Sequence, residues 1–146
     1  MNRQGCIHPE ILSVLSRCGH GDRILIADGN YPIASRCPQA AHVYLGVSAG
    51  IPGVPEVLDA ILTEINVEEA TVMTPGSGTE PPIFAEFKKR LPGINLRELG
   101  RFEFYAAATE PNVRLAISTG ESRTYANILL TIGVAGVLGP EGNGNE

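Results

Sequence analysis

Apolar residues recur along the chain with two spacings, one typical of helices and one typical of strands. The helical spacing, with an apolar residue at every third or fourth position, runs through residues 9–18, 54–65 and 83–91. Short apolar runs typical of strands occur between and after these segments, at residues 24–27, 41–46, 70–74, 95–99, 113–119 and 128–134. This alternation predicts a layered α/β domain.

Proline and glycine mark where the first of these segments begin and end. Pro9 opens the first helical pattern, because its fixed φ suits the first turn of a helix. Gly19 is expected to end that helix. After the first strand, the triplet Asp28-Gly29-Asn30 has the composition of a turn.

The second half of the chain adds four weaker features. Residues 113–119 alternate between apolar and polar, as a half-buried strand does, and residues 101–108 predict one or two helical turns. The stretch at 75–82, "PGSGTEPP", predicts a loop. We therefore expect one domain over residues 1–138 and a disordered tail, "GPEGNGNE", at 139–146.

Composition narrows the class of partner and the compartment. The net charge of −5 argues against a nucleic-acid partner, and the 18% of charged residues suggests a surface partly covered by other subunits. No apolar run is long enough to span a bilayer, so no membrane partner is expected. Three widely spaced cysteines, Cys6, Cys18 and Cys37, form neither a disulfide framework nor a zinc motif. We expect a reduced, cytoplasmic protein.

His20 is the first candidate for chemistry, because a glycine flanks it on each side. An imidazole exchanges protons near neutral pH, and small neighbours leave it accessible to a ligand. The alternative is a surface histidine beyond a helix end, where its cationic form favours the helix dipole. The local sequence alone favours the alternative.

Asp28 is the second candidate, because it stands where an apolar run stops. In open α/β sheets, ligand-binding groups collect beyond the carboxyl ends of strands. The alternative is a structural role, since an aspartate before a glycine commonly hydrogen-bonds the backbone of its own turn. Local sequence leaves both interpretations open.

Tyr125 and Asn127 supply a phenol and an amide just before the last strand. Such groups suit a neutral polyhydroxyl ligand, because an amide both donates and accepts hydrogen bonds. The alternative is a turn that happens to carry polar side chains. The nearby Gly120 is not part of a phosphate-binding motif, since neither a Walker lysine nor a G-x-G-x-x-G pattern is present.

The remaining candidates are weaker. His8 and His42 lack ligand-like spacing to other metal-binding residues, so no metal is expected. Cys37 has no neighbouring base in the sequence, which makes a hydrolase with a cysteine nucleophile the least favoured interpretation. The pair Glu68-Glu69 is interpreted as capping or following a helix.

Three segments occur in the order and spacing of a known family: "HPEILSVLSRCGHGDRILIADGNYP" at 8–32, "RFEFY" at 101–105 and "TGESRTYANILLTIGV" at 119–134. Through them the chain resembles the D-ribose pyranase / L-fucose mutarotase (RbsD/FucU) family, and the fucose branch more closely. The resemblance implies a single-domain three-layer α/β/α sandwich with a mainly parallel or mixed sheet. It also implies an isomerase that interconverts cyclic forms of a free monosaccharide without a cofactor.

The resemblance assigns roles to individual residues. His20 matches the family's proton-donating histidine, and Arg101 matches the position where fucose-type members carry arginine and ribose-type members histidine. The residues that match sugar-binding positions are Asp28, Arg101, Tyr125, Ala126 and Asn127, and Tyr105 is expected as a further contact with the sugar. A non-catalytic sugar-binding or transport-associated protein is the alternative function, although a pure binder has no need of a proton carrier.

The spacing of His20 and Asp28 adds a geometric constraint. If residues 24–27 are extended, eight steps of roughly 3.3 Å separate the two side chains by up to about 26 Å, far more than a monosaccharide spans. We therefore expect that His20 either folds back along the strand or meets Asp28 of a neighbouring subunit. The second option agrees with the homo-oligomeric ring, a pentamer or decamer with sites at subunit interfaces, that the resemblance implies.

Overall fold

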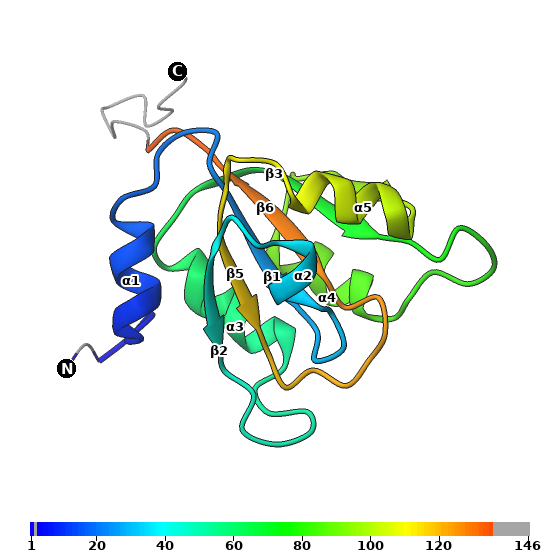
Figure 1. Ribbon diagram of the computed structural model, residues 1–146, viewed down its shortest axis with the longest axis horizontal. Helices are drawn as coiled ribbons and strands as arrows, with labels where there is room; N and C mark the ends of the chain where they lie inside the picture. Colours follow the sequence, from blue (N-terminus) through cyan, green and yellow to red (C-terminus); the bar gives the residue numbers. More distant parts are fainter. Residues whose placement is uncertain (2, 136–146) are drawn as a thin grey trace.

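A six-stranded mixed sheet forms the middle layer of the molecule. The computed structural model describes residues 1 and 3–135, and within them the strand order is β2-β5-β1-β6-β3-β4 (Figure 1). The strands are β1 (Arg23–Ala27), β2 (Ala41–Tyr44), β3 (Val67–Met73), β4 (Leu96–Leu99), β5 (Val113–Ser118) and β6 (Ile128–Ile132). All of them belong to one sheet, as the α/β pattern of the sequence predicts.

Within the described sheet, β6 alone runs against its neighbours. β1 pairs in parallel with β5, β5 with β2, and β3 with β4, whereas β6 pairs antiparallel with both β1 and β3. The carboxyl ends of the five parallel strands therefore meet at one edge of the sheet, and β6 begins at that edge. The loops that follow β1, β3 and β4 converge there with the segment that leads into β6.

Helices cover both faces of the sheet. α1 (Pro9–Leu15), α3 (Val54–Leu62) and α4 (Ile83–Arg90) pack on one face, and α2 (Ile33–Arg36) and α5 (Arg101–Ala108) pack on the other. Figure 1 shows α2 and α5 in front of the sheet and α4 behind it. The predicted three-layer α/β/α sandwich with a mixed sheet is confirmed.

The continuous apolar run at β1 follows from its central place between two helical layers. Ile24 and Ile26 pack in the core under α1, α3 and α4, while Leu25 and Ala27 pack in the core under α2 and α5. Successive side chains of a strand point to opposite faces, so a strand covered on both sides is apolar throughout. Each large side chain buried in this way contributes about 1.5–3 kcal/mol to folding.

Three expectations about individual elements need correction. Residues 113–119 do not form a half-buried strand: β5 lies between β1 and β2, and its central residues 115–117 are fully buried. The first helix ends at Leu15 rather than near Gly19, and the Ser16 hydroxyl donates a hydrogen bond to the carbonyl of Ser13 at 2.7 Å, which competes with helix continuation. The short helix α2 has no counterpart among the predicted elements, because four residues are too few to show a helical period.

Two further expectations concern the chain end and membranes. The predicted tail at 139–146 lies outside the described residues. Among the helices of the described part, none has both the length and the apolar character that crossing a bilayer requires.

Candidate active site

A pocket of about 280 Å³ opens at the edge of the sheet where the carboxyl ends of the parallel strands meet. Its walls come from the segments that follow β1 and β4, from the last residue of β3 and from the segment that precedes β6. The lining residues are Asp28, Asn30, Tyr31, Met73, Arg101, Tyr105, Thr124, Tyr125 and Asn127. Five of the seven residues predicted for the site meet here, although they are spread over a hundred positions of sequence.

Asp28 is the buried acceptor of the pocket. Its exposed fraction is 3%, and its Oδ1 accepts a hydrogen bond from the backbone N–H of Asn30 at 2.9 Å. The Asx-turn that was the structural alternative for Asp28 is therefore present, and it coexists with a place in the pocket. Burial raises the pKa of the Asp28 carboxyl above its ordinary value, although hydrogen bonds from backbone groups and from Asn127 oppose this effect.

Asn127 is tied directly to Asp28. The backbone N–H of Asp28 donates to Asn127 Oδ1 at 2.8 Å, and the Asn127 side chain also hydrogen-bonds the Asp28 carboxyl. These contacts fix the orientation of the amide, which is itself only 3% exposed. The end of β1 and the start of β6 thus present a carboxylate and an amide in one rigid unit.

Arg101 and Tyr105 are the pocket residues that α5 contributes. They lie one helical turn apart on α5, and Arg101 Nε donates to Tyr105 Oη at 3.3 Å. That hydrogen bond raises the pKa of Arg101, so the guanidinium stays cationic. From α2, the guanidinium carbon of Arg36 lies 4.4 Å from the centre of the Tyr105 ring. The α5 side of the pocket is therefore cationic and aromatic, and the end of β1 contributes the carboxylate of Asp28 to the same pocket.

Tyr31 is a pocket residue that the sequence analysis missed. Its ring packs edge-to-face against Tyr105, with centroids 5.3 Å apart, and against Phe104 at 5.9 Å. Its hydroxyl is buried and has no hydrogen-bond partner among the described residues, and burial raises its pKa. An aromatic residue directly after the Asp28-Gly29-Asn30 turn was the signal that could have revealed it.

Tyr125 enters the pocket with an unusual backbone. Its φ is 58°, the only positive φ of a non-glycine residue in the described chain. Such a conformation costs a residue with a side chain of order 1–3 kcal/mol and persists where surrounding contacts enforce it. Ala126, predicted as a sugar contact, does not line the pocket: its methyl group is buried in the core, and its backbone hydrogen-bonds the Asp28 carboxyl.

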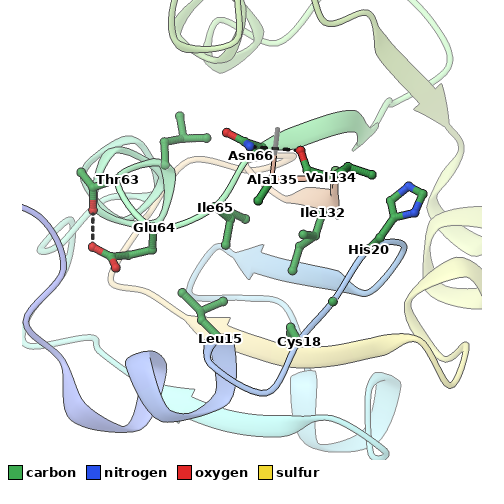
Figure 2. Close-up of a pocket in the computed structure, with 13 residues that line it drawn as sticks. Leu15, Cys18, His20, Thr63, Glu64, Ile65, Asn66, Ile132, Val134 and Ala135 are labelled. Atoms are coloured by element: carbon green, nitrogen blue, oxygen red, sulfur yellow. Dashed lines mark hydrogen bonds between the residues drawn. The ribbon is translucent and has the colours of Figure 1, made fainter. Parts of the chain in front are cut away.

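His20 lies apart from this pocket. It lines a different hollow, of about 470 Å³, near the opposite end of β1, together with residues such as Leu15, Ile65 and Ile132 (Figure 2). The two hollows share no residue, so His20 does not fold back along β1 to reach Asp28 in the same chain. Figure 2 shows its imidazole directed away from the apolar side chains of the hollow.

The His20 loop is held by backbone contacts, and the imidazole has one acidic neighbour. Gly21 N–H donates to the carbonyl of Ile132 at 2.9 Å, and Gly19 N–H donates to the Asp22 carboxylate at 2.8 Å. His20 Nε2 lies 3.0 Å from Glu68 Oε1 on β3, and both side chains are about half exposed. Glu68 was not among the predicted site residues, and it orients the ring from a neighbouring strand.

The structure gives little support to metal or thiol chemistry. No group of three or more His, Cys, Asp or Glu side chains suited to a metal ion occurs among the described residues. The Cys37 thiol is buried and donates to the carbonyl of Ala108 at 3.1 Å, and burial raises its pKa. A thiol that is both buried and held in its protonated form is a poor nucleophile, which argues against the cysteine hydrolase.

The fold and this pocket define an α/β protein with a site for a small ligand that carries many hydrogen-bonding groups. The chain belongs to the RbsD/FucU family: the model described as "RbsD / FucU transport protein family" matches residues 1–135. D-ribose pyranase 1 of Rubrobacter xylanophilus is 34% identical over 135 residues, which cover 92% of this chain and 98% of the relative. The resemblance seen in three segments of the sequence is confirmed.

Two solved structures that share this fold are more than 30% identical in sequence to this chain. FucU from Bifidobacterium longum is 36% identical, with a TM-score of 0.72 over 88% of this chain and 95% of that chain. The fucose mutarotase of Streptococcus pneumoniae, solved in complex with L-fucose, is 31% identical, with a TM-score of 0.74 over 88% and 94%. The family thus includes relatives named for ribose and for fucose.

Proposed function

We propose that this protein is a cofactor-free monosaccharide mutarotase that interconverts the anomers of L-fucose or a related sugar. The isomerase class follows from the family, whose members include the D-ribose pyranase and the fucose mutarotase named above. The observation that supports the proposal here is the pocket in which Asp28, Asn127 and Arg101 converge.

The polar groups of the pocket suit the hydroxyls of one sugar ring. Asp28 accepts hydrogen bonds, Arg101 donates them, and the amide of Asn127 supplies both kinds of group. The aromatic rings of Tyr105 and Tyr125 offer apolar surface to the carbon face of a sugar. The volume of about 280 Å³ lies just below the usual range of drug-sized ligand pockets, about 300–1,000 Å³, which fits a single sugar ring.

Mutarotation needs two proton transfers and no net redox change. Loss of the proton from the anomeric hydroxyl and delivery of a proton to the ring oxygen break the bond between C1 and that oxygen and leave an open-chain aldehyde. Rotation about one bond, followed by the reverse transfers, closes the other anomer. We assign proton delivery to the ring oxygen to His20, while water accepts the anomeric proton and returns a proton to the imidazole. General acid–base help of this kind accelerates a reaction about 10²- to 10⁴-fold.

The separation of His20 from the pocket supports a site shared between subunits. The five residues of β1 span about 16 Å at 3.3 Å per residue, which places the imidazole of one chain beyond the reach of a sugar on Asp28 of that chain. We propose a homo-oligomeric ring, pentameric or decameric, in which His20 of one subunit meets the Asp28 pocket of the next. Such a head-to-tail contact closes a ring when the rotation between subunits allows it.

Arg101 supports a sugar of the fucose type. By the resemblance it matches the position where fucose-type members carry arginine, and it contributes a cation to the lining of the pocket. Overall identity does not separate the branches, since the D-ribose pyranase and FucU relatives match at 34% and 36%. Exchange between pyranose and furanose forms is a second activity to measure on the same sugars.

The first test is exchange NMR on anomeric protons, with L-fucose, D-ribose and D-galactose as probes. We expect faster exchange between α and β anomers for L-fucose, and loss of this acceleration in His20→Ala. Protein that accelerates exchange of none of these sugars, or a His20→Ala variant with full activity, would contradict the proposal.

The second test addresses the shared site by co-expressing two variants and assaying them with L-fucose far below KM, where His20→Ala lacks the proton carrier and Asp28→Asn, which binds the sugar weakly, is nearly inactive. His20→Ala keeps the pocket, and Asp28→Asn keeps the imidazole. In random 1:1 assemblies about one quarter of sites combine an intact His20 with an intact Asp28, so about one quarter of the activity returns. If each site is built within one chain, the mixture stays inactive.

A non-catalytic sugar-binding protein remains the alternative, and one observation favours it. The pocket around Asp28 is formed within a single chain and does not involve His20. Binding of L-fucose by calorimetry without any acceleration of anomer exchange would decide for this alternative.

A further inference from the structure

The segment 119–127 carries Tyr125 and Asn127 into the pocket although it lies outside all helices and strands. Figure 1 shows it as the orange connection between the end of β5 and the start of β6. A loop that presents two side chains to a small pocket needs contacts that hold its shape. Those contacts come from two charged residues that the proposed mechanism does not use, Glu121 and Arg123.

The first part of the segment is anchored to the end of β1. The Thr119 hydroxyl donates to the carbonyl of Ala27 at 2.8 Å and accepts the N–H of Glu121 at 3.1 Å. Gly29, next to Asp28, donates its N–H to the carbonyl of Glu121 at 2.8 Å. A Cβ at Gly120 would collide with backbone oxygen atoms of a neighbouring loop, so the chain passes this point without a side chain. The backbone of Glu121 is therefore fixed beside the Asp28 turn.

The Glu121 carboxylate is buried and accepts hydrogen bonds from helix α3 and from Arg123 of its own loop. Its exposed fraction is 4%, and it accepts the N–H of Val54, the first residue of α3, at 3.1 Å. Arg123 Nε donates to it at 2.8 Å, Arg123 Nη2 at 3.0 Å and the Arg123 backbone N–H at 3.2 Å. This bidentate ion pair with Arg123 lowers the pKa of the Glu121 carboxyl, which stays ionised at neutral pH.

Arg123 extends the same connection to α4. Its Nη1 donates to Glu86 Oε2 at 2.5 Å. One guanidinium therefore joins the loop to α4, while its carboxylate partner joins the loop to α3. Both helices belong to the layer opposite α5, so the pocket loop is held from the far face of the sheet.

Tyr125 lies two residues beyond Arg123 and has the positive φ described above. A backbone conformation of this kind persists only when its neighbours enforce it. We propose that Glu121 and Arg123 are positioning residues, an ion-paired clamp that holds Tyr125 in the pocket and Asn127 against Asp28. This inference rests on the proposed function for its readout in sugar affinity, and on the structure alone for its readout in loop order.

The test uses two conservative variants of the full chain, Arg123→Lys and Glu121→Gln. Lysine keeps the positive charge but cannot form the bidentate hydrogen bonds, and glutamine keeps the shape of glutamate but loses its negative charge. We expect KM and Kd for L-fucose to rise about tenfold, with kcat changed less than about threefold because His20 is at the other end of β1. Amide hydrogen exchange over residues 122–127 becomes about tenfold faster.

Arg90→Lys is the matched control. Arg90 lies on α4, pairs with Asp59 at 2.8 Å, and makes no contact with the pocket loop among the described residues. The Arg90→Lys variant should leave both the affinity for L-fucose and the amide hydrogen exchange of residues 122–127 unchanged. An equal effect of Arg90→Lys, or no effect of either clamp variant on affinity and exchange, would overturn the proposal.

A double-mutant cycle separates positioning from general stability. If Arg123 acts through Tyr125, the loss of affinity in Arg123→Lys combined with Tyr125→Phe is smaller than the product of the single losses. Independent effects that simply multiply would overturn the assignment. If no sugar binds at all, the proposed function fails, while faster loop exchange in Arg123→Lys but not in Arg90→Lys still supports the clamp.

Discussion

The two ends of β1 carry the two best candidates for chemistry, and they differ in almost every physical property. At the carboxyl end, Asp28 is buried and hydrogen-bonded to backbone groups, and Asn127 is locked against it. At the amino end, His20 is about half exposed, with Glu68 as its acidic neighbour. The carboxyl end of β1 therefore borders a pocket whose polar groups are fixed by hydrogen bonds, whereas the amino end carries one half-exposed imidazole.

This difference separates binding from proton transfer. A buried, fixed set of hydrogen-bonding groups recognises a ligand with little reorganisation, whereas an exposed imidazole needs a ligand brought to it. In the proposed mechanism the pocket of one subunit brings the sugar to the imidazole of another. Substitutions at the two ends should therefore change different kinetic constants.

The largest effect is expected from His20→Ala. Removal of the proton carrier should lower kcat for anomer exchange about 10²- to 10⁴-fold. The Kd for L-fucose should change less than about threefold, because the polar groups of the pocket all come from one chain and His20 is not among them. Exchange NMR and calorimetry measure the two quantities, and His8→Ala, at the cap of α1, is the control. If Kd rose by as large a factor as kcat fell, His20 would contribute to sugar binding as well as to proton transfer. The proposed division of roles between the two ends of β1 would then be wrong.

Asp28→Asn should show the opposite pattern. A hydrogen bond to a charged group contributes about 1.5–3 kcal/mol, so its loss should weaken sugar binding about 10- to 100-fold. Calorimetry with L-fucose measures this directly. Unchanged affinity would remove Asp28 from the sugar site.

Asp28→Asn should also change how the thermal stability of the protein depends on pH. Because the folded-state pKa of Asp28 is raised above its ordinary value of 3.8, ionisation of this group costs the folded state stability as pH rises above that value. Asp28→Asn should therefore have a Tm at pH 7 equal to or above that of the parent chain. The advantage should vanish below pH 3.8, where Asp28 is protonated in both states. Thermal melts across this range would contradict the argument if the variant were less stable at pH 7.

A smaller effect is expected from Glu68→Gln. An ion pair that is about half exposed contributes about 0.2–1 kcal/mol, so the rate of anomer exchange should fall by no more than about fivefold. Affinity for L-fucose should not change. Glu69→Gln is the matched control, because Glu69 is the next exposed carboxylate of β3 and pairs with no cation among the described residues. Equal losses in both variants would show that Glu68 does not act through His20.

The smallest effect is expected from Tyr31→Phe. The Tyr31 hydroxyl has no hydrogen-bond partner among the described residues, so its removal should leave the free energy of unfolding unchanged or raise it by less than about 1 kcal/mol. Denaturant unfolding measures the change. A loss of more than about 1 kcal/mol would show that the hydroxyl has a partner in the folded protein.

The local elements could be predicted from the sequence because they depend on neighbouring residues. The helical period at 54–65 and 83–91 corresponds to α3 and α4, and the apolar run at 24–27 corresponds to β1. The Asp28 turn was also a local feature. Five site residues could be named from the sequence because they lie in the three segments that carry the resemblance. The structure places all five in one pocket.

Tertiary structure alone decided how those elements combine. The reversed direction of β6 and the full burial of β5 depend on long-range strand pairing, which periodicity does not report. The same holds for the contact of Glu68 with His20 and for the clamp between Glu121 and Arg123, since each closes only when distant segments pack. The sequence by itself determined the elements and most of the chemistry, while packing of the layers decided that His20 and Asp28 of one chain serve different hollows.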